Sequence, residues 1–189
     1  MFHSKSLLGN HREDLLQGAA VGLLGGLVAS WVMNQFQTHV PASAFARVLG
    51  ENGAGNGAQS EESQRGSEDE ADPATVKAAQ AVSTTVFHHE LTPEEKKWAG
   101  PLVHYSFGAA TGALYGAMAE QAPTVTRGLG VPFGAMWWLV ADETFVPTLR
   151  LSQAPWKYPA SSHVYALASH LVYGLTTEAI RRMVRPRLS

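Results

Sequence analysis

The stretch PLVHYSFGAATGALYGAMAEQA, residues 101–122, decides the fold of this chain. Every fourth residue of a helix lies on the same face. On one face of this stretch stand His104, Gly108, Gly112, Gly116 and Glu120. Each interior glycine costs a helix in water about 1 kcal/mol relative to alanine, whereas in a bilayer small residues let two helices approach closely. The stretch therefore predicts a tightly packed transmembrane helix.

A second apolar stretch near the N-terminus repeats this pattern. Residues 15–37 carry no charge and would form a helix roughly 34 Å long, which is enough to span a hydrocarbon core. Gly18, Gly22 and Gly26 follow one another at four-residue spacing and predict a second helix-packing face. A cleaved signal peptide is the alternative, because residues 42–44 (ASA) resemble a cleavage site. The apolar run is longer than a usual signal sequence, which favours the span.

Two further apolar blocks complete a predicted bundle of four transmembrane helices. Residues 129–147 are the weakest block because they include Asp142 and Glu143, and residues 161–183 form the last one. We therefore expect an all-α, polytopic membrane protein, with residues 1–189 forming a single membrane domain.

The region between the first two spans has a different composition. Residues 50–72 hold seven acidic residues and one arginine among small polar residues, so we expect a disordered acidic loop. Calcium binding by this loop is an alternative, but the ordered ligand spacing that it needs is missing. Residues 73–88 have valines and alanines on one side and predict a short amphipathic helix at the membrane surface or on the end of the bundle.

Two helix start signals follow the acidic loop. Asp72 before Pro73 is typical of an N-cap followed by proline at the first helical position. Thr92 and Glu95 have the spacing of a capping box, in which each side chain bonds the backbone N–H of the other's position.

Composition excludes several classes of function. The chain has no cysteine, so disulfides, thiolate nucleophiles and cysteine metal sites are ruled out. Its net charge of −2 gives no sign of nucleic-acid binding. No hydrolase, zinc-protease, phosphate-loop or dinucleotide motif is present, so we expect no enzyme and no cofactor. The expected partners are the lipid bilayer and, as an option, further copies of the chain.

Four spans would place both termini on the same side of the membrane. The two tails and the loop at Arg127 hold seven lysines and arginines, whereas only five on the other side lie near membrane ends. This difference favours cytoplasmic termini and an acidic loop on the outside.

Ionisable and polar groups within the spans fall into two sets. A candidate intramembrane cluster comprises Asn34, His104, Asp142, Glu143, His163 and His170. Headgroup-level polarity is the structural explanation for the groups near the helix ends, and a hydrogen bond to a neighbouring helix is that for His170. Proton relay or metal binding is the functional explanation, with His104, His163 and Asp142 as weak metal candidates. At the other side we expect an ion network of Glu120, Glu178, Arg181 and Arg182. Arg181 and Arg182 lie three and four residues after Glu178, so local pairing is available.

Several motifs resemble one known family. His170-Leu171-Val172, followed after five residues by Glu178 and then by Ile180-Arg181-Arg182, resembles the end of YagU-like bacterial inner-membrane proteins. The glycine-rich residues 22–37 (GLLGGLVASWVMNQFQ) are similar to the opening of that family. The resemblance implies a multi-pass protein of the bacterial inner membrane, with no established catalytic residues to transfer.

Three classes of function remain open from the sequence. The first is a structural or accessory membrane bundle. The second is a small proton-linked transporter or channel component that uses the intramembrane histidines and glutamates. The third is a histidine-ligated metal or haem protein, in which imidazoles from neighbouring helices would supply the ligands.

Overall fold

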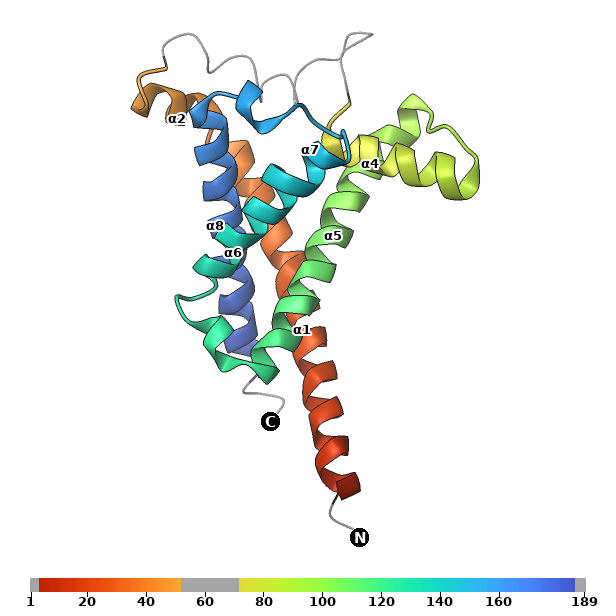
Figure 1. Cartoon of the computed structure of the whole chain (residues 1–189), viewed down its shortest axis with the longest axis vertical. Coiled ribbons are helices and arrows are strands. Elements are labelled where there is room, and N and C mark those ends of the chain that lie inside the picture. Colours follow the sequence, from red (N-terminus) through yellow and green to blue (C-terminus); the bar gives the residue numbers. More distant parts are fainter. Residues whose placement is uncertain (1–3, 52–71, 186–189) are drawn as a thin grey trace. The chain divides into compact units, whose positions relative to one another are not determined.

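The structure is a computed structural model of the 189-residue chain, and it describes residues 4–51 and 72–185. All regular secondary structure in these two ranges is helical, with no strand among them (Figure 1). The prediction of an all-α fold is therefore confirmed. Most of the predicted acidic loop, residues 52–71, lies outside the described residues.

Long helices are separated by short helices and turns. In chain order they are α1 (Ser4–His39), α2 (Ala42–Val48), α4 (Ala74–Val82), the π-helix η1 (Ser83–Phe87), α5 (Pro93–Gln121), the 3₁₀ turn η2 (Pro123–Thr126), α6 (Val131–Val140), the π-helix η3 (Ala141–Phe145), α7 (Val146–Thr148), the 3₁₀ turn η4 (Pro155–Lys157) and α8 (Ala160–Val184).

A proline explains the wide turn between α6 and α7. Pro147 cannot donate a backbone hydrogen bond, and its ring crowds the carbonyl of the residue four positions earlier, which is Glu143. The π-helix Ala141–Phe145 stands immediately before it, and the Thr144 hydroxyl donates to the Leu139 carbonyl at 2.9 Å, five residues back. The helix therefore widens at the two acidic residues that the sequence places in this block.

The chain divides into two compact units. Unit 1 comprises Met1–Asn34, Tyr105–Ala135 and His170–Ser189, and unit 2 comprises Gln35–His104 and Met136–Ser169. Helices α1, α5 and α8 each contribute residues to both units.

Backbone-to-backbone approach at glycines holds unit 1 together. A Cβ atom on Gly22 would overlap the carbonyl oxygen of Gly112, and one on Gly26 would overlap that of Gly108, so α1 and α5 lie side by side at van der Waals contact (Figure 1). A Cβ atom on Gly134 of α6 would likewise overlap the His170 carbonyl of α8. Only glycine permits this separation at these positions.

The core of unit 1 combines aromatic rings with small polar groups. Its apolar centre consists of Ala29, Met33, Tyr115, Phe133 and Tyr173. The rings of Tyr115 and Phe133 lie 4.6 Å apart, and the Tyr173 hydroxyl donates to the Gly108 carbonyl at 2.6 Å. Both tyrosines therefore bury their rings and satisfy their hydroxyls at the same time.

Unit 2 has its own aromatic contacts around Tyr165. The Tyr165 ring stacks on Phe36 at 6.0 Å and meets Phe45 edge-on at 5.6 Å. Its hydroxyl donates to the Gln37 carbonyl at 3.1 Å, and the Ser161 backbone N–H donates to Glu51 at 3.3 Å. These contacts join α2 and the end of α1 to the start of α8.

One start signal read from the sequence is confirmed and one is wrong. Thr92 and Glu95 form the capping box, with the Thr92 N–H donating to the Glu95 carboxylate at 2.8 Å and the Glu95 N–H to the Thr92 hydroxyl at 3.3 Å. Asp72 does not cap α4, because Pro73 occupies the N-cap position and makes no side-chain cap bond. The Asp72 carboxylate instead accepts from Lys96 at 2.7 Å.

The four predicted spans differ in how apolar their helices are. One described stretch, His11–His39 of α1, is long and apolar enough to cross a membrane by length and composition. Helix α5 begins with charged residues at Glu94–Lys97, and α8 contains serines, threonines and histidines among its apolar residues. A four-span bundle therefore stays a prediction.

Candidate functional site

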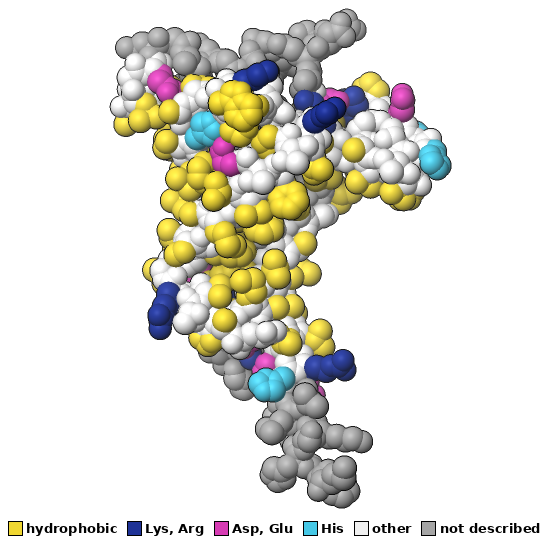
Figure 2. Space-filling view, in the orientation of Figure 1, with side chains coloured by type: hydrophobic (Ala, Val, Ile, Leu, Met, Phe, Trp, Pro, Cys, Tyr) yellow, Lys and Arg dark blue, Asp and Glu magenta, His cyan; other side chains and the backbone are white. Residues whose placement is uncertain are grey.

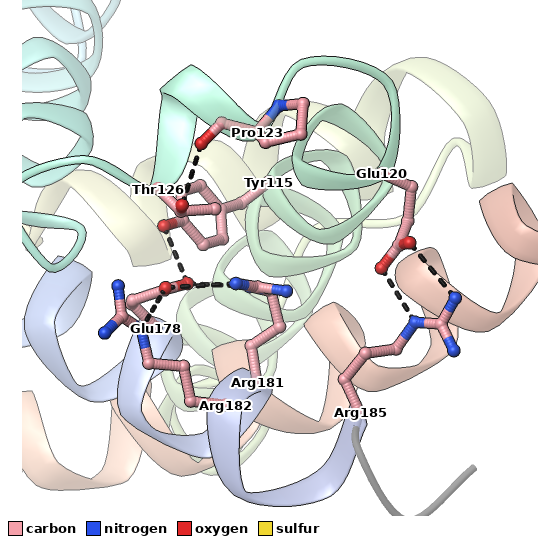
Figure 3. Close-up of polar contacts among 8 residues, drawn as sticks. All are labelled: Tyr115, Glu120, Pro123, Thr126, Glu178, Arg181, Arg182 and Arg185. Atoms are coloured by element: carbon pink, nitrogen blue, oxygen red, sulfur yellow. Dashed lines mark hydrogen bonds and ion pairs between the residues drawn. The ribbon is translucent and has the colours of Figure 1, made fainter. Parts of the chain in front are cut away.

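The most deeply buried charged group that the structure describes is the carboxylate of Glu178 on α8. The side chain is 1% exposed and accepts the Tyr115 hydroxyl of α5 at 2.9 Å. Arg181 donates to both carboxylate oxygens, from Nε at 2.7 Å and from Nη2 at 3.1 Å, and Arg182 donates from Nε at 2.6 Å (Figure 3). We call Tyr115, Glu178, Arg181 and Arg182 the Glu178 network.

The Glu178 network satisfies its buried charge completely. Four hydrogen bonds reach the two carboxylate oxygens, and three of them come from guanidinium groups, which make the stronger charge-assisted bonds. Removing a partner from such a buried pair is expensive, because it leaves an uncompensated charge. The arrangement therefore fixes the last two turns of α8 against α5 in one geometry.

A second ion cluster gathers around Arg185, just after α8. Arg185 donates to Glu120 of α5 from Nε at 2.8 Å and from Nη2 at 3.1 Å (Figure 3). It also reaches α1, where it contacts Gln17 at 3.0 Å and Asp14 at 3.1 Å. We call Asp14, Gln17, Glu120 and Arg185 the Arg185 clamp, since one guanidinium just after α8 contacts both α1 and the end of α5.

The clamp includes residues that the sequence analysis did not single out. Glu120 is predicted to share a network with Arg181 and Arg182, and the structure pairs it with Arg185 instead. Arg185 lies 65 residues after Glu120 and 171 residues after Asp14. No local spacing rule connects residues so far apart, although the apolar surroundings of Glu120 already called for a cationic partner.

The six residues of the predicted intramembrane cluster do not fall in one unit. Asn34 and His170 belong to unit 1, whereas His104, Asp142, Glu143 and His163 belong to unit 2. His170 is buried, with 9% of its surface exposed, and Asn34 is exposed.

Within unit 2 the structure brings two members of that cluster together. His163 Nδ1 lies 2.5 Å from Glu143 Oε1, and His163 Nε2 lies 3.0 Å from the Pro155 carbonyl oxygen. The Tyr158 ring meets the imidazole edge-on at 6.5 Å. A neutral imidazole has a single N–H, and at His163 the Pro155 carbonyl takes it from Nε2. The contact between His163 Nδ1 and Glu143 therefore needs one further proton, which the two side chains share. His163, near the start of α8, therefore contacts both η3 and the loop before α8.

Metal binding needs several ligands at one point. Among residues 4–51 and 72–185, no three His, Asp or Glu side chains are grouped closely enough to hold an ion. His163 of the weak candidate set has its ring nitrogens facing Glu143 and Pro155.

The fold and the two ion clusters define an all-helical protein whose ion pairs form along α8 and between Arg185 and helices α1 and α5. By its sequence the chain belongs to the family described as Protein of unknown function (DUF1440), whose model matches residues 64–179. The match includes Tyr115, Glu120 and Glu178 and ends before Arg181. No curated protein and no solved structure matches the chain.

Proposed function

We propose that this chain is a multi-pass integral membrane protein, a helix bundle with a structural or accessory role. The observation that carries the proposal is the distribution of polarity in unit 1, where polar side chains are buried and large apolar side chains are exposed. Buried polar side chains and extensive exposed apolar surface are the two informative departures from the pattern of a water-soluble protein.

The buried polar residues of unit 1 are nearly inaccessible. Exposed fractions are 1% for Ser30, 3% for Thr111, 0% for Thr177 and 1% for Glu178. Small hydroxyl residues at helix contacts are typical of membrane bundles, because they allow close approach and bond the carbonyl one turn back. The Thr177 hydroxyl does this, donating to the Tyr173 carbonyl at 2.9 Å.

The exposed residues of the same helices are large and apolar. On α1, Leu16 is 70% exposed, Leu24 52% and Trp31 55%, and on α5 Phe107 is 51% exposed. Further exposed apolar residues of unit 1 are Leu23, Val28, Leu114, Leu175 and Met183. Figure 2 shows hydrophobic side chains over much of the visible surface. So many exposed apolar side chains indicate a lipid-facing surface.

Helix lengths suit this proposal. Helix α5 has 29 residues and α8 has 25, which correspond to roughly 44 and 38 Å against a hydrocarbon core of about 30 Å. The glycine contacts between α1 and α5 supply the close packing that membrane helices use in place of a hydrophobic core.

The resemblance to YagU-like proteins supports the bacterial inner membrane as the location. The larger number of lysines and arginines near span ends on the side of the two tails supports cytoplasmic termini. A structural role is favoured over proton transport because the Glu178 carboxylate already has four hydrogen bonds within unit 1. A transporter is the second candidate, since His170 and Glu178 are both buried on α8, eight residues or about 12 Å apart. Proton flux into liposomes, lost in His170→Ala, would favour that candidate.

Cysteine accessibility tests whether α5 crosses the membrane. The chain has no cysteine, so single-cysteine variants carry no background. Lys77→Cys lies before α5 and Arg127→Cys after it, and a membrane-impermeant maleimide is applied to intact and to permeabilised cells. We expect labelling at position 77 in intact cells and at position 127 only after permeabilisation. Equal labelling of both positions in intact cells, or a protein that alkaline carbonate releases from the membrane, would contradict the proposal.

A further inference from the structure

Helix α4 and the π-helix η1, residues Ala74–Phe87, form a short arm within unit 2. The arm is fastened to the start of α5 at its base and to the loop before α5 further along. At its base Asp72 accepts from Lys96 of α5 at 2.7 Å, and at the start of η1 the Ser83 hydroxyl donates to the carbonyl of the loop residue His89 at 2.8 Å. Gln80 accepts the Leu91 backbone N–H at 3.0 Å. The arm is therefore held in one direction relative to α5.

Although it is held rigidly, the arm leaves its largest apolar side chains uncovered. Val82 is 55% exposed, Val86 62% and Phe87 72%. Val82 and Val86 are four residues apart, and His88 then turns the chain back with a left-handed backbone, φ 52°. Figure 2 shows hydrophobic side chains along the lower edge of the arm. We call Val82, Val86 and Phe87 the apolar edge.

The Thr84 hydroxyl, close in sequence to the apolar edge, is bonded within the arm. It donates to the Gln80 carbonyl at 2.9 Å and lies 3.2 Å from the Ala81 carbonyl. A hydroxyl already bonded to its own helix loses little when water is removed. Thr84 can thus leave water without becoming an unsatisfied donor.

The base of the arm contacts α5 where the charged first residues of this helix give way to apolar ones. A Cβ atom on Gly100 of α5 would meet Val76 of the arm at 2.8 Å. Residues 94–97 just before this point are all charged, and Trp98 and Leu102 around it are 55% and 56% exposed. Tryptophan next to lysine at a polar-to-apolar boundary is typical of the headgroup region of a bilayer.

From these observations we propose that the apolar edge inserts into the headgroup region of the lipid bilayer and acts as an interfacial anchor beside α5. The inference rests on the proposed membrane insertion and adds the lipid surface as the partner of the arm. Lipid is favoured as the occupant because the base of the arm packs on Gly100, between the exposed side chains of Trp98 and Leu102. Each buried methylene at such an interface adds to binding in proportion to its area.

Spin-label depth measurements test this inference on the full-length chain. Labelled single-cysteine variants at Val86 and Phe87 are compared with Lys77, which lies about 140° round α4 from Val82 and serves as the matched control. The protein is placed in vesicles of equal parts phosphatidylethanolamine and phosphatidylglycerol. Collision rates are measured with oxygen, which concentrates in lipid, and with a nickel chelate, which stays in water. A label at Leu24 reports separately on membrane insertion.

We expect labels at positions 86 and 87 to have a several-fold higher ratio of oxygen to nickel collisions than position 77, with position 24 higher still. Nickel access at 86 and 87 equal to that at 77, with 24 in lipid, would overturn the anchor and leave the membrane proposal intact. Nickel access at 24 would overturn both. Dipolar broadening at 87 that disappears on dilution with unlabelled protein would place a second copy on the edge and also overturn the anchor.

Discussion

The hydroxyl of Tyr115 on α5 donates a 2.9 Å hydrogen bond to the carboxylate of Glu178 on α8, and both side chains are at most 1% exposed. The bond joins two helices whose contributing residues lie 63 positions apart. Arg181 and Arg182 of α8 bind the same carboxylate. Glu178 therefore takes part both in ion pairs along α8 and in the contact between α8 and α5.

Substitutions in the Glu178 network should separate the contribution of the Tyr115 hydrogen bond to stability from that of the arginine ion pairs. Tyr115→Phe removes one hydrogen bond to a charged group and should lower the free energy of unfolding by about 1.5–3 kcal/mol. Glu178→Gln leaves two arginines without their anion and should cost more, about 3–5 kcal/mol. Unfolding in detergent solution measures both. Equal and small losses for the two variants would show that the carboxylate does not anchor the helices.

Two glycines on α1 should respond differently to alanine. A Cβ atom on Gly22 overlaps the Gly112 carbonyl, so Gly22→Ala must force two backbones apart and should destabilise unit 1 by about 2 kcal/mol or more. Gly25 is the matched control, because its nearest neighbour, the Thr177 carbonyl, lies 3.1 Å from the new Cβ. There the gain in helix propensity, about 1 kcal/mol, offsets the crowding. Thermal unfolding of both variants tests this difference. An equal loss of stability in the two variants would refute the contact between α1 and α5.

The loop before α8 should depend on His163. His163→Phe removes the contacts to Glu143 and to the Pro155 carbonyl, so the backbone amides of Lys157 and Tyr158 should exchange with deuterium faster. Tyr158→Phe is the control, since it removes only the hydroxyl that accepts the Gln153 N–H at 3.1 Å. Unchanged exchange in His163→Phe would mean that the imidazole does not fasten the loop.

The capping box makes the stability of the first turn of α5 depend on pH. The Thr92 backbone N–H, then the His89 side chain and the Thr92 hydroxyl, hydrogen-bond the Glu95 carboxylate and lower its pKa from 4.5 to about 2. A lowered pKa in the folded state means that the cap stabilises the helix above pH 4.5 and loses this effect as the pH falls toward 2.

Carbon-13 NMR of the Glu95 carboxyl checks this prediction. We expect its titration midpoint to lie well below 4.5 in the wild type and to move upward in Thr92→Val, which keeps the shape of the side chain and loses the hydroxyl. A wild-type midpoint near 4.5 would contradict the cap.

Sequence reasoning reached the features that depend on neighbours along the chain. The all-helical class and the Thr92–Glu95 cap follow from periodicity and spacing, and both are confirmed. The spacing of Glu178 to Arg181 and Arg182 likewise identifies contacts that the structure contains. Such features require only local geometry.

What sequence reasoning missed depends on tertiary approach. Asp72 does not take its predicted capping position, and its carboxylate pairs instead with Lys96, 24 residues away. Arg185 as the partner of Glu120 has no local signature, since 65 residues separate them. The number of membrane spans stays a prediction, because α5 and α8 mix polar residues into their apolar faces.

The most direct test of the central proposal is a lysine at an exposed position of α1. Leu24 is 52% exposed near the middle of the apolar stretch His11–His39, and Leu16, 70% exposed near its end, is the control. In lipid, Leu24→Lys should cost about 3 kcal/mol and sharply reduce the carbonate-resistant fraction, whereas Leu16→Lys can extend to the headgroups and should insert almost normally. In water either change would fall within about 0.5 kcal/mol. A Leu24→Lys variant that stays folded and becomes soluble without detergent would contradict membrane insertion.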